Sequence, residues 1–190
     1  MNSPEKENPT FNGHDNNATD AFGVKSDRES ISGWLVVFLY LGIGLFSIIS
    51  LLYVIVNAYE CDLGLSPLTF LMLTPGIIFC ATGAFTIIAF HKRQPNAVSL
   101  AKTYMVMIAL SGIFGAIASV IIGESFSVEG FIGILRQFML AGGGYAYLSI
   151  SQQVETIIPS ETRISDNLEK YLLAGFIASE FFLLVACPFI

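Results

Sequence analysis

Three stretches of the chain run for 20 residues or more without a charged side chain: Trp34–Val56, Pro67–Phe90 and Tyr104–Gly123. A bilayer core of about 30 Å is crossed by about 20 apolar residues in helical form. Hydrophobic residues make up 54% of the 190 residues and charged residues only 13%, against about 25% in soluble domains. The sequence therefore predicts an all-α integral membrane helical bundle, with the lipid bilayer as its surroundings and no nucleic-acid partner.

Two further stretches are predicted to cross the membrane in spite of polar residues. Phe131–Ile150 carries Arg136 and Gln137 near its start, and we expect it to be the fourth span. Tyr171–Cys187 carries Glu180 near its middle. Its nine Leu, Ile, Val and Phe residues favour insertion by about 3 to 5 kcal/mol, against about 2.5 to 3.5 kcal/mol for a central acidic charge. This fifth segment either spans the membrane or lies on it.

The remaining residues divide the chain into four predicted parts. Residues 1–30 contain six acids, three bases and few large apolar side chains, which is typical of a disordered tail. The predicted parts are a disordered acidic cytoplasmic tail (1–30), a four-helix transmembrane domain (31–158, with helices 34–56, 67–90, 104–123 and 131–150), a linker (159–170) and the fifth helix (171–187).

The positions of the basic residues predict the orientation. Eight of the nine lysines and arginines fall in the tail, after the second span or after the fourth span, and Arg136 is the exception. Lysine and arginine concentrate on the cytoplasmic side of membrane proteins. We therefore expect a multi-pass protein with its amino terminus in the cytoplasm.

Two helix starts carry recognisable signals. Ser66 followed by Pro67 predicts a helix that begins with proline, where the missing N–H costs nothing. Asp166 and Glu169 have the spacing of a capping box, which predicts that a helix restarts there after Pro159.

Small residues gather in the third and fourth spans. The third span has small residues at a strict spacing of four: Ser111, Gly115, Ser119 and Gly123. The fourth contains three consecutive glycines, Gly142, Gly143 and Gly144. Membrane helices associate where small residues let their backbones approach, so we expect these two faces to serve helix packing. A hinge or a ligand cleft at the three glycines is the functional alternative.

Arg136 and Glu180 are the charged side chains inside the predicted spans, and such residues suggest functional sites. Their distances from the outer surface differ by about two residues, or about 3 Å at 1.5 Å per residue. They form a candidate intramembrane polar pair. In the alternative, Arg136 reaches the outer headgroups and Glu180 is protonated or faces another subunit.

The sequence contains no motif that indicates catalysis or cofactor binding. Cys61, Cys80 and Cys187 lack metal-ligand spacing, so we expect no metal site, no cofactor and no enzymatic activity. Cys61 and Cys187 would both lie on the oxidising outer side, where they could form a disulfide.

Three segments resemble a bacterial family known as domain of unknown function 2569. They are "ISGWLVVFLYLGIGL" in the first helix, "FHKRQPNAVSLAKTY" between the second and third, and "YAYLSISQQVETIIP" after the fourth. The resemblance covers about residues 28–160 and implies a small four-helix protein of the bacterial inner membrane. Gln152, Gln153 and Glu155 depart from the family pattern, which has basic residues at these positions. The family implies no activity.

These features favour a non-enzymatic inner-membrane protein that associates with another membrane component, either a membrane-protein partner or further copies of itself. The small-residue faces and the unpaired acid in the last helix support this interpretation. The rival hypothesis is a small transporter or permeation subunit with a polar path near Arg136 and Glu180.

Overall fold

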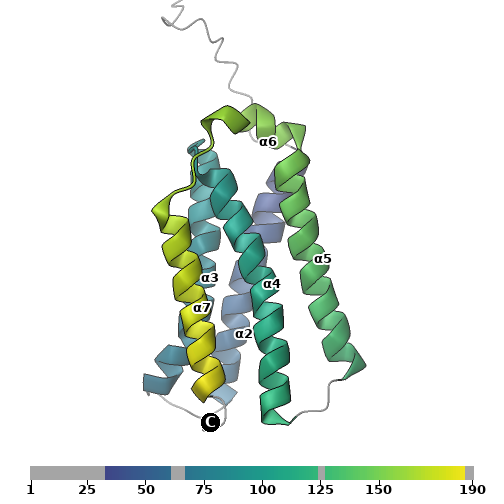
Figure 1. The fold of residues 1–190 in the computed structure, drawn as a ribbon, viewed down its shortest axis with the longest axis vertical. Helices are drawn as coiled ribbons and strands as arrows, with labels where there is room; N and C mark the ends of the chain where they lie inside the picture. Colours follow the sequence, from purple (N-terminus) through teal and green to yellow (C-terminus); the bar gives the residue numbers. More distant parts are fainter. Residues whose placement is uncertain (1–32, 61–66, 124–126, 187–190) are drawn as a thin grey trace, which may run out of the picture. The chain divides into compact units, whose positions relative to one another are not determined.

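The computed structural model describes residues 33–60, 67–123 and 127–186, and these residues form helices joined by short connections (Figure 1). The chain divides into Met1–Ser30 and Ile31–Ile190, and every described residue belongs to the second unit. The predicted tail, 1–30, therefore lies outside the described residues. The elements are α1 (Trp34–Val37), η1 (Phe38–Leu45), α2 (Phe46–Glu60), α3 (Pro67–His91), α4 (Ala97–Ile122), α5 (Val128–Ile150), α6 (Gln152–Ile157), η2 (Ser160–Thr162) and α7 (Asn167–Ala186).

The long helices that pack on one another are antiparallel, except α4 and α7, which run in the same direction (Figure 1). α2 packs on α3, α3 on α4, and α4 on α5, while α7 packs on both α3 and α4. α6 crosses one end of the bundle, which we call the α6 end, where α3 and α5 finish and α4 and α7 begin (Figure 1). The other end, where α2, α4 and α7 finish, is called the far end. The predicted linker and fifth helix thus pack as part of the bundle.

Within the described ranges, three helical stretches are long and apolar enough to cross a membrane: Trp34–Val56, Met72–His91 and Ala97–Ile122. This confirms a helical protein suited to a membrane. α5 and α7 are not among the three, so the predicted count of four or five spans is not confirmed. Both helices have sufficient length, with 23 and 20 residues.

Several predicted helix limits differ from the structure: the first helix continues to Glu60, and the fourth begins at Val128. The third helix was expected to begin at Tyr104, after Lys102, but α4 begins at Ala97. Lys102 is accommodated inside the helix because its ammonium lies 5.0 Å from the centre of the Tyr145 ring on α5. α7 begins at Asn167, within the predicted linker, rather than at Tyr171.

The two halves of the bundle are packed differently. The buried residues of α4 all lie between Ala97 and Gly112, and none follows Gly112. α5 likewise buries Ala141, Gly144 and Leu148 in its second half and no residue in its first. The dense core therefore lies toward the α6 end, and the bundle is more open toward the far end.

α2 and α3 approach each other closely at Gly83. A methyl group added to this glycine would lie 2.3 Å from the Ser47 hydroxyl oxygen and 3.3 Å from the side chain of Ile43. The Ser47 hydroxyl is buried there and lies 2.6 Å from the Tyr104 hydroxyl on α4. Both hydroxyls also donate to the backbone carbonyl of Ile43, at 2.7 Å and 3.0 Å. This group of hydrogen bonds joins η1, α2 and α4 beside α3.

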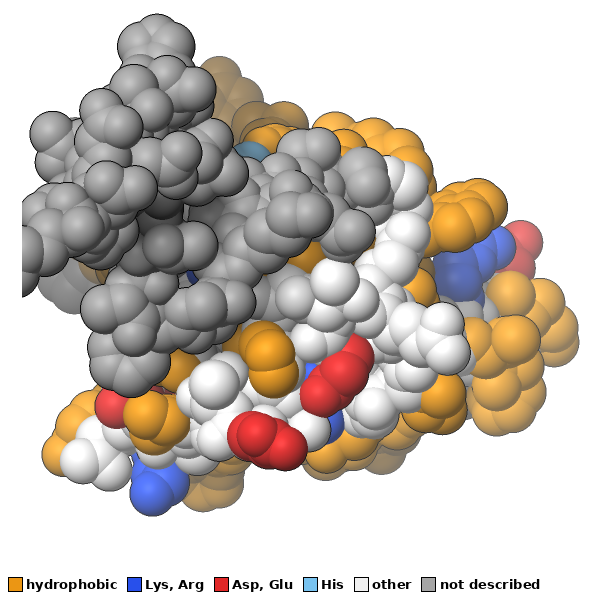
Figure 2. Space-filling model, turned by 90° about the horizontal axis from the view of Figure 1, so that it is seen from above, with side chains coloured by type: hydrophobic (Ala, Val, Ile, Leu, Met, Phe, Trp, Pro, Cys, Tyr) orange, Lys and Arg blue, Asp and Glu red, His pale blue; other side chains and the backbone are white. Residues whose placement is uncertain are grey.

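Hydrogen bonds also fasten the connections at the α6 end. The Ile164 N–H donates to the Pro95 carbonyl at 3.1 Å, and the Asn96 amide donates to Asp166 at 3.1 Å. The Glu169 carboxylate accepts the backbone N–H of Asp166 at 3.1 Å, as the capping-box spacing predicts, and it also accepts the Ser99 hydroxyl. Figure 2 looks onto this end and shows acidic and basic side chains among polar ones.

Glu155 connects α6 to the segment that follows it. Its carboxylate accepts the Ser160 backbone N–H at 2.7 Å and forms an ion pair with Arg163 at 2.6 Å. The Ser160 N–H, with Arg163 as a smaller cause, holds the pKa of Glu155 below its ordinary value.

We predict that Gly83→Ala lowers the free energy of unfolding by about 1 to 3 kcal/mol, because the added methyl group displaces the buried Ser47 hydroxyl. The matched control is Gly142→Ala on α5, where an added methyl group meets no atom within 4 Å. The control should keep or gain about 0.5 to 1 kcal/mol, since alanine favours a helix. Unfolding in mixed micelles measures both variants, and equal stability of the two would contradict the close approach at Gly83.

We also predict that the protection of the Ser160 amide against hydrogen exchange depends on pH. The Glu155 contacts stabilise the connection above the ordinary glutamate pKa of about 4.3, and this stabilisation is lost as the pH falls through the lowered pKa. Glu155→Gln should remove that pH dependence. If the Ser160 amide of Glu155→Gln lost protection over the same pH range as the parent, a group other than Glu155 would cause the pH dependence.

Candidate interhelical cavity

A cavity of about 430 Å³ lies in the open half of the bundle, and we call it the central cavity. Five helices contribute to its walls. Its polar lining side chains are Ser50 and Tyr53 from α2, Ser111 from α4, Gln137 from α5 and Glu180 from α7. Ile49 and Tyr53 line it although they are 54% and 69% exposed, so they lie at its mouth. α2 and α5 have little direct contact, which leaves the opening between them.

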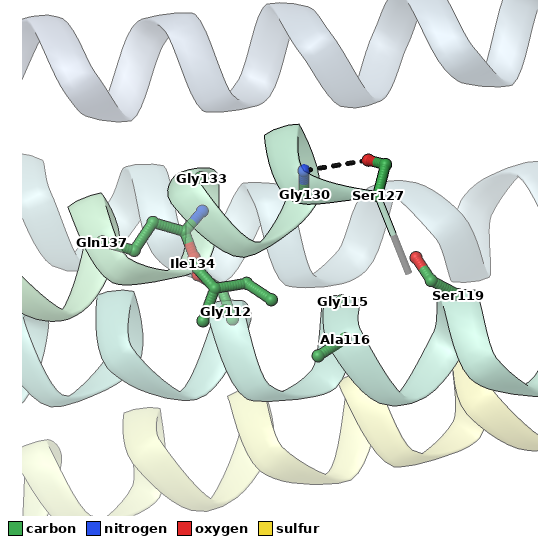
Figure 3. A pocket seen from close by; sticks show the side chains of 10 residues that line it. Gly112, Gly115, Ala116, Ser119, Ser127, Gly130, Gly133, Ile134 and Gln137 are labelled. Carbon is green, nitrogen blue, oxygen red and sulfur yellow. Dashed lines mark hydrogen bonds between the residues drawn. The ribbon is translucent and has the colours of Figure 1, made fainter. Parts of the chain in front are cut away.

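A second cavity of about 320 Å³, the α4–α5 groove, adjoins the first (Figure 3). Its lining is formed by small residues of both helices: Ser111, Gly112, Gly115, Ala116 and Ser119 on α4, and Ser127, Gly130 and Gly133 on α5. The Ser127 hydroxyl accepts the Gly130 N–H at 3.0 Å and caps α5. Ser111, Gly115 and Gln137 line both cavities, so the two spaces share one wall.

Gln137 is the polar side chain that points from α5 toward α4 at this wall (Figure 3). An added methyl group on Gly112 would lie 2.4 Å from its side-chain oxygen, so the glycine makes room for it. That oxygen is buried, and no group among the described residues donates a hydrogen bond to it. A buried acceptor without a donor is costly, so the Gln137 oxygen marks an unsatisfied polar position in the wall of the cavity.

Glu180 is the charged side chain in the lining of the central cavity. It lies one helical turn after Phe176, which lines the same space. Neither cavity is lined by a lysine, an arginine or another acid from the described part of the chain. The carboxylate thus lies inside the bundle rather than on its lipid-facing surface.

The structure does not bring Arg136 and Glu180 together. Arg136 is exposed on α5 and lines neither cavity, and no ion pair joins the two residues in the described ranges. Successive residues of a helix point about 100° apart. The face of α5 that meets the cavity therefore presents Gln137 rather than Arg136. Gln137, and not Arg136, lines the cavity together with Glu180.

Aromatic rings close the central cavity toward the α6 end. Phe46, Phe79 and Phe176 line it, with the Phe79 ring centre 5.9 Å from Phe46 and 6.2 Å from Phe176. The Tyr104 ring lies 4.4 Å from Phe79 and is fully buried beyond it. These rings separate the cavity from the hydroxyl pair of Ser47 and Tyr104.

The predicted packing residues have different roles in the structure. Ser111, Gly115 and Ser119 line the groove, and Gly123 ends α4 with a positive φ of 79°. Methyl groups added to Gly142 and Gly143 would meet no atom within 4 Å. A methyl group on Gly144 would lie 2.5 Å from the Met105 sulfur and 3.1 Å from Phe38, so this glycine alone among the three is in close contact. It faces α4 and η1 at once.

The described part of the chain offers no site for a metal ion. No group of three His, Cys, Asp or Glu side chains lies close enough together in the ranges that the structure covers. Cys80 is a half-buried free thiol on α3. Cys61 and Cys187, the predicted disulfide partners, lie outside the described residues.

Comparison of the chain with models of protein families, with curated proteins and with solved structures finds no match. The class of protein therefore rests on the structure itself. The described part of the chain is helical, with three helices able to cross a membrane and a partly polar cavity between its helices.

We predict that a double-mutant cycle of Arg136→Gln and Glu180→Gln gives additive effects on the free energy of unfolding, with a coupling below about 0.5 kcal/mol. The reason is that the two side chains face different surroundings. Unfolding of the parent, both single variants and the double variant in mixed micelles provides the coupling. A coupling well above 1 kcal/mol, the size found for residues in contact, would show that the two side chains form an ion pair and contradict the structure.

Proposed function

We propose that this chain is a non-enzymatic integral membrane protein that associates with another membrane component and binds it in the central cavity. One observation carries the proposal: Glu180 and the unpartnered oxygen of Gln137 both belong to the wall of a cavity that opens between α2 and α5. Ligand sites are concave, mostly apolar and supplied with a few polar groups. A mouth between two membrane-facing helices admits a molecule that already resides in the bilayer.

The proposal includes a topology. α5 and α7 pack against α4 and have the length to cross a bilayer, so we propose that all five long helices do so (Figure 1). Lys92, Arg93, Lys102, Arg163 and Lys170 belong to the ends of helices, or to connections, at the α6 end. Under the positive-inside rule this end and the amino terminus are cytoplasmic. The resemblance to domain of unknown function 2569 supports a bacterial inner membrane.

A second candidate is a transporter or permeation subunit. The favouring observation is that the central cavity opens laterally in one half of the bundle and is closed toward the α6 end by Phe46, Phe79 and Phe176. A site reached from one side and closed on the other is the arrangement that alternating access requires. In this case the aromatic rings would separate to release the bound molecule.

The test of the proposed function uses the wall that both cavities share. Gly115 lines both, and an added methyl group there meets no atom within 4 Å, so Gly115→Leu fills the space without an immediate clash. Gly142→Leu is the matched control, because this glycine also meets nothing and lines neither cavity. We expect native mass spectrometry of polymer-extracted membranes to detect a bound component on the parent and on Gly142→Leu, and to lose it from Gly115→Leu.

The same bound species on all three proteins would contradict binding in the cavity. A stoichiometric protein partner that survives Gly115→Leu would assign the association to another surface. Flux of the bound species into vesicles that contain the parent, absent with Gly115→Leu, would favour the transporter over simple binding.

A further inference from the structure

We propose that the central cavity binds an organic cation, with its positive charge at Glu180 and its apolar body between the helices. This inference rests on the proposed function, since it specifies the chemical class of the component that occupies the cavity. The acidic group of the lining, its hydrogen-bonding groups, its aromatic rings and its size all suit such a ligand.

The lining contains one acidic side chain and no basic one among the described residues. Glu180 is the charged side chain of the cavity wall, and no described lysine or arginine forms an ion pair with it. An ionised carboxylate away from water is costly unless an opposite charge lies close to it. A cationic ligand supplies that charge, whereas an anionic ligand would be repelled.

The polar groups that share this lining with Glu180 also favour a cation. The buried side-chain oxygen of Gln137 accepts no hydrogen bond from the described residues. The Ser111 hydroxyl donates to the Ile108 carbonyl at 2.8 Å, so toward this space its oxygen can only accept, while the Ser50 hydroxyl can accept or donate. A positive charge in this space would be attracted both by the carboxylate and by the partial negative charge of the amide oxygen.

Aromatic rings complete the wall. Phe46, Phe79 and Phe176 line the cavity as one connected cluster, and Tyr53 lies at its mouth. The faces of aromatic rings attract cations, most strongly where water is excluded. These rings therefore suit both the charge and the apolar body of such a ligand.

The size and the ligand set favour an organic ion over a metal ion. A volume of about 430 Å³ is within the range of sites for small organic molecules. Glu180 is the one carboxylate of the lining, and the described residues hold no group of three metal-ligating side chains. The lateral mouth at Ile49 and Tyr53 admits an amphiphilic cation from the bilayer.

The experiment compares two probes of the same shape and opposite charge. Tetraphenylphosphonium and tetraphenylborate are added to the purified chain in lipid nanodiscs, and equilibrium dialysis measures their binding, with empty nanodiscs as the blank. We expect saturable binding of the phosphonium at one site and no saturable binding of the borate. Glu180→Gln should weaken phosphonium binding at least about tenfold, because it removes the charge that the cation faces.

Two further variants keep the test decisive. Glu161→Gln removes an exposed acid of η2, far from the cavity lining, and should leave binding unchanged. Gly115→Leu should abolish binding and Gly142→Leu should not, which tests the site even if Glu180→Gln fails to fold.

Equal binding of both probes, or phosphonium binding that persists in a folded Glu180→Gln variant, would overturn the cation proposal. The proposed function has its own test, which is whether Gly115→Leu loses the native component that mass spectrometry detects on the parent protein. Competition by sodium or potassium at the same concentrations as the phosphonium would also overturn it, because an inorganic site needs no apolar body.

Discussion

The hydroxyl groups of Ser47 and Tyr104 meet against Gly83, and the arrangement of the bundle depends on this contact. Both hydroxyls are bound to the Ile43 carbonyl, so η1, α2, α3 and α4 are held at one level of the bundle. In a membrane, apolar side chains gain little by leaving lipid, and close backbone approach together with interhelical hydrogen bonds determines how helices associate. Here Gly83 provides the close backbone approach, and the hydroxyls of Ser47 and Tyr104 provide the hydrogen bonds.

The position of this contact explains why the two halves of the bundle differ. Toward the α6 end, helices that already touch at Gly83 continue into a core closed by α6, whose Val154 and the following Ile158 are buried. Toward the far end, α5 touches α4 through small residues but has little contact with α2. The central cavity and the α4–α5 groove occupy the space that results. The cavity therefore results from how the helices are joined. Its polar side chains are not needed to form it, and they determine what it can bind.

Much of the fold could be predicted from the sequence because lipid imposes a simple rule of length and polarity. The three charge-free stretches correspond to helices, α3 begins at Pro67, and the Asp166–Glu169 capping contact is present. The start of α4 was missed because Lys102 was treated as a boundary, although its charge is stabilised by the ring of Tyr145 on another helix. A contact between helices that are distant in sequence cannot be inferred from the composition of one of them.

The candidate site was predicted only in part, for a related reason. Glu180 was identified because an acid in an apolar stretch is conspicuous, and Gln137 was passed over for its charged neighbour Arg136. The direction of a side chain around α5 depends on which face meets α4, and this face is recognisable only afterwards, from Gly112, which leaves room for the glutamine. Among the three consecutive glycines, Gly144 alone packs closely for the same reason. The charge of Glu180 makes it recognisable from the sequence. Which residues lie beside it depends on the rotation of α5 about its axis, which the sequence does not show.

The aromatic rings that close the central cavity toward the α6 end bear on the choice between binding and permeation. A continuous polar path would need to connect Glu180 with the hydroxyls of Ser47 and Tyr104, and the ring of Phe79 lies between them in contact with Tyr104. Opening that path would separate rings that pack against the same hydroxyl pair that joins η1, α2 and α4. Such a movement would disturb the contact on which the bundle depends. Binding from the bilayer requires no such movement, and for this reason we place it ahead of transport.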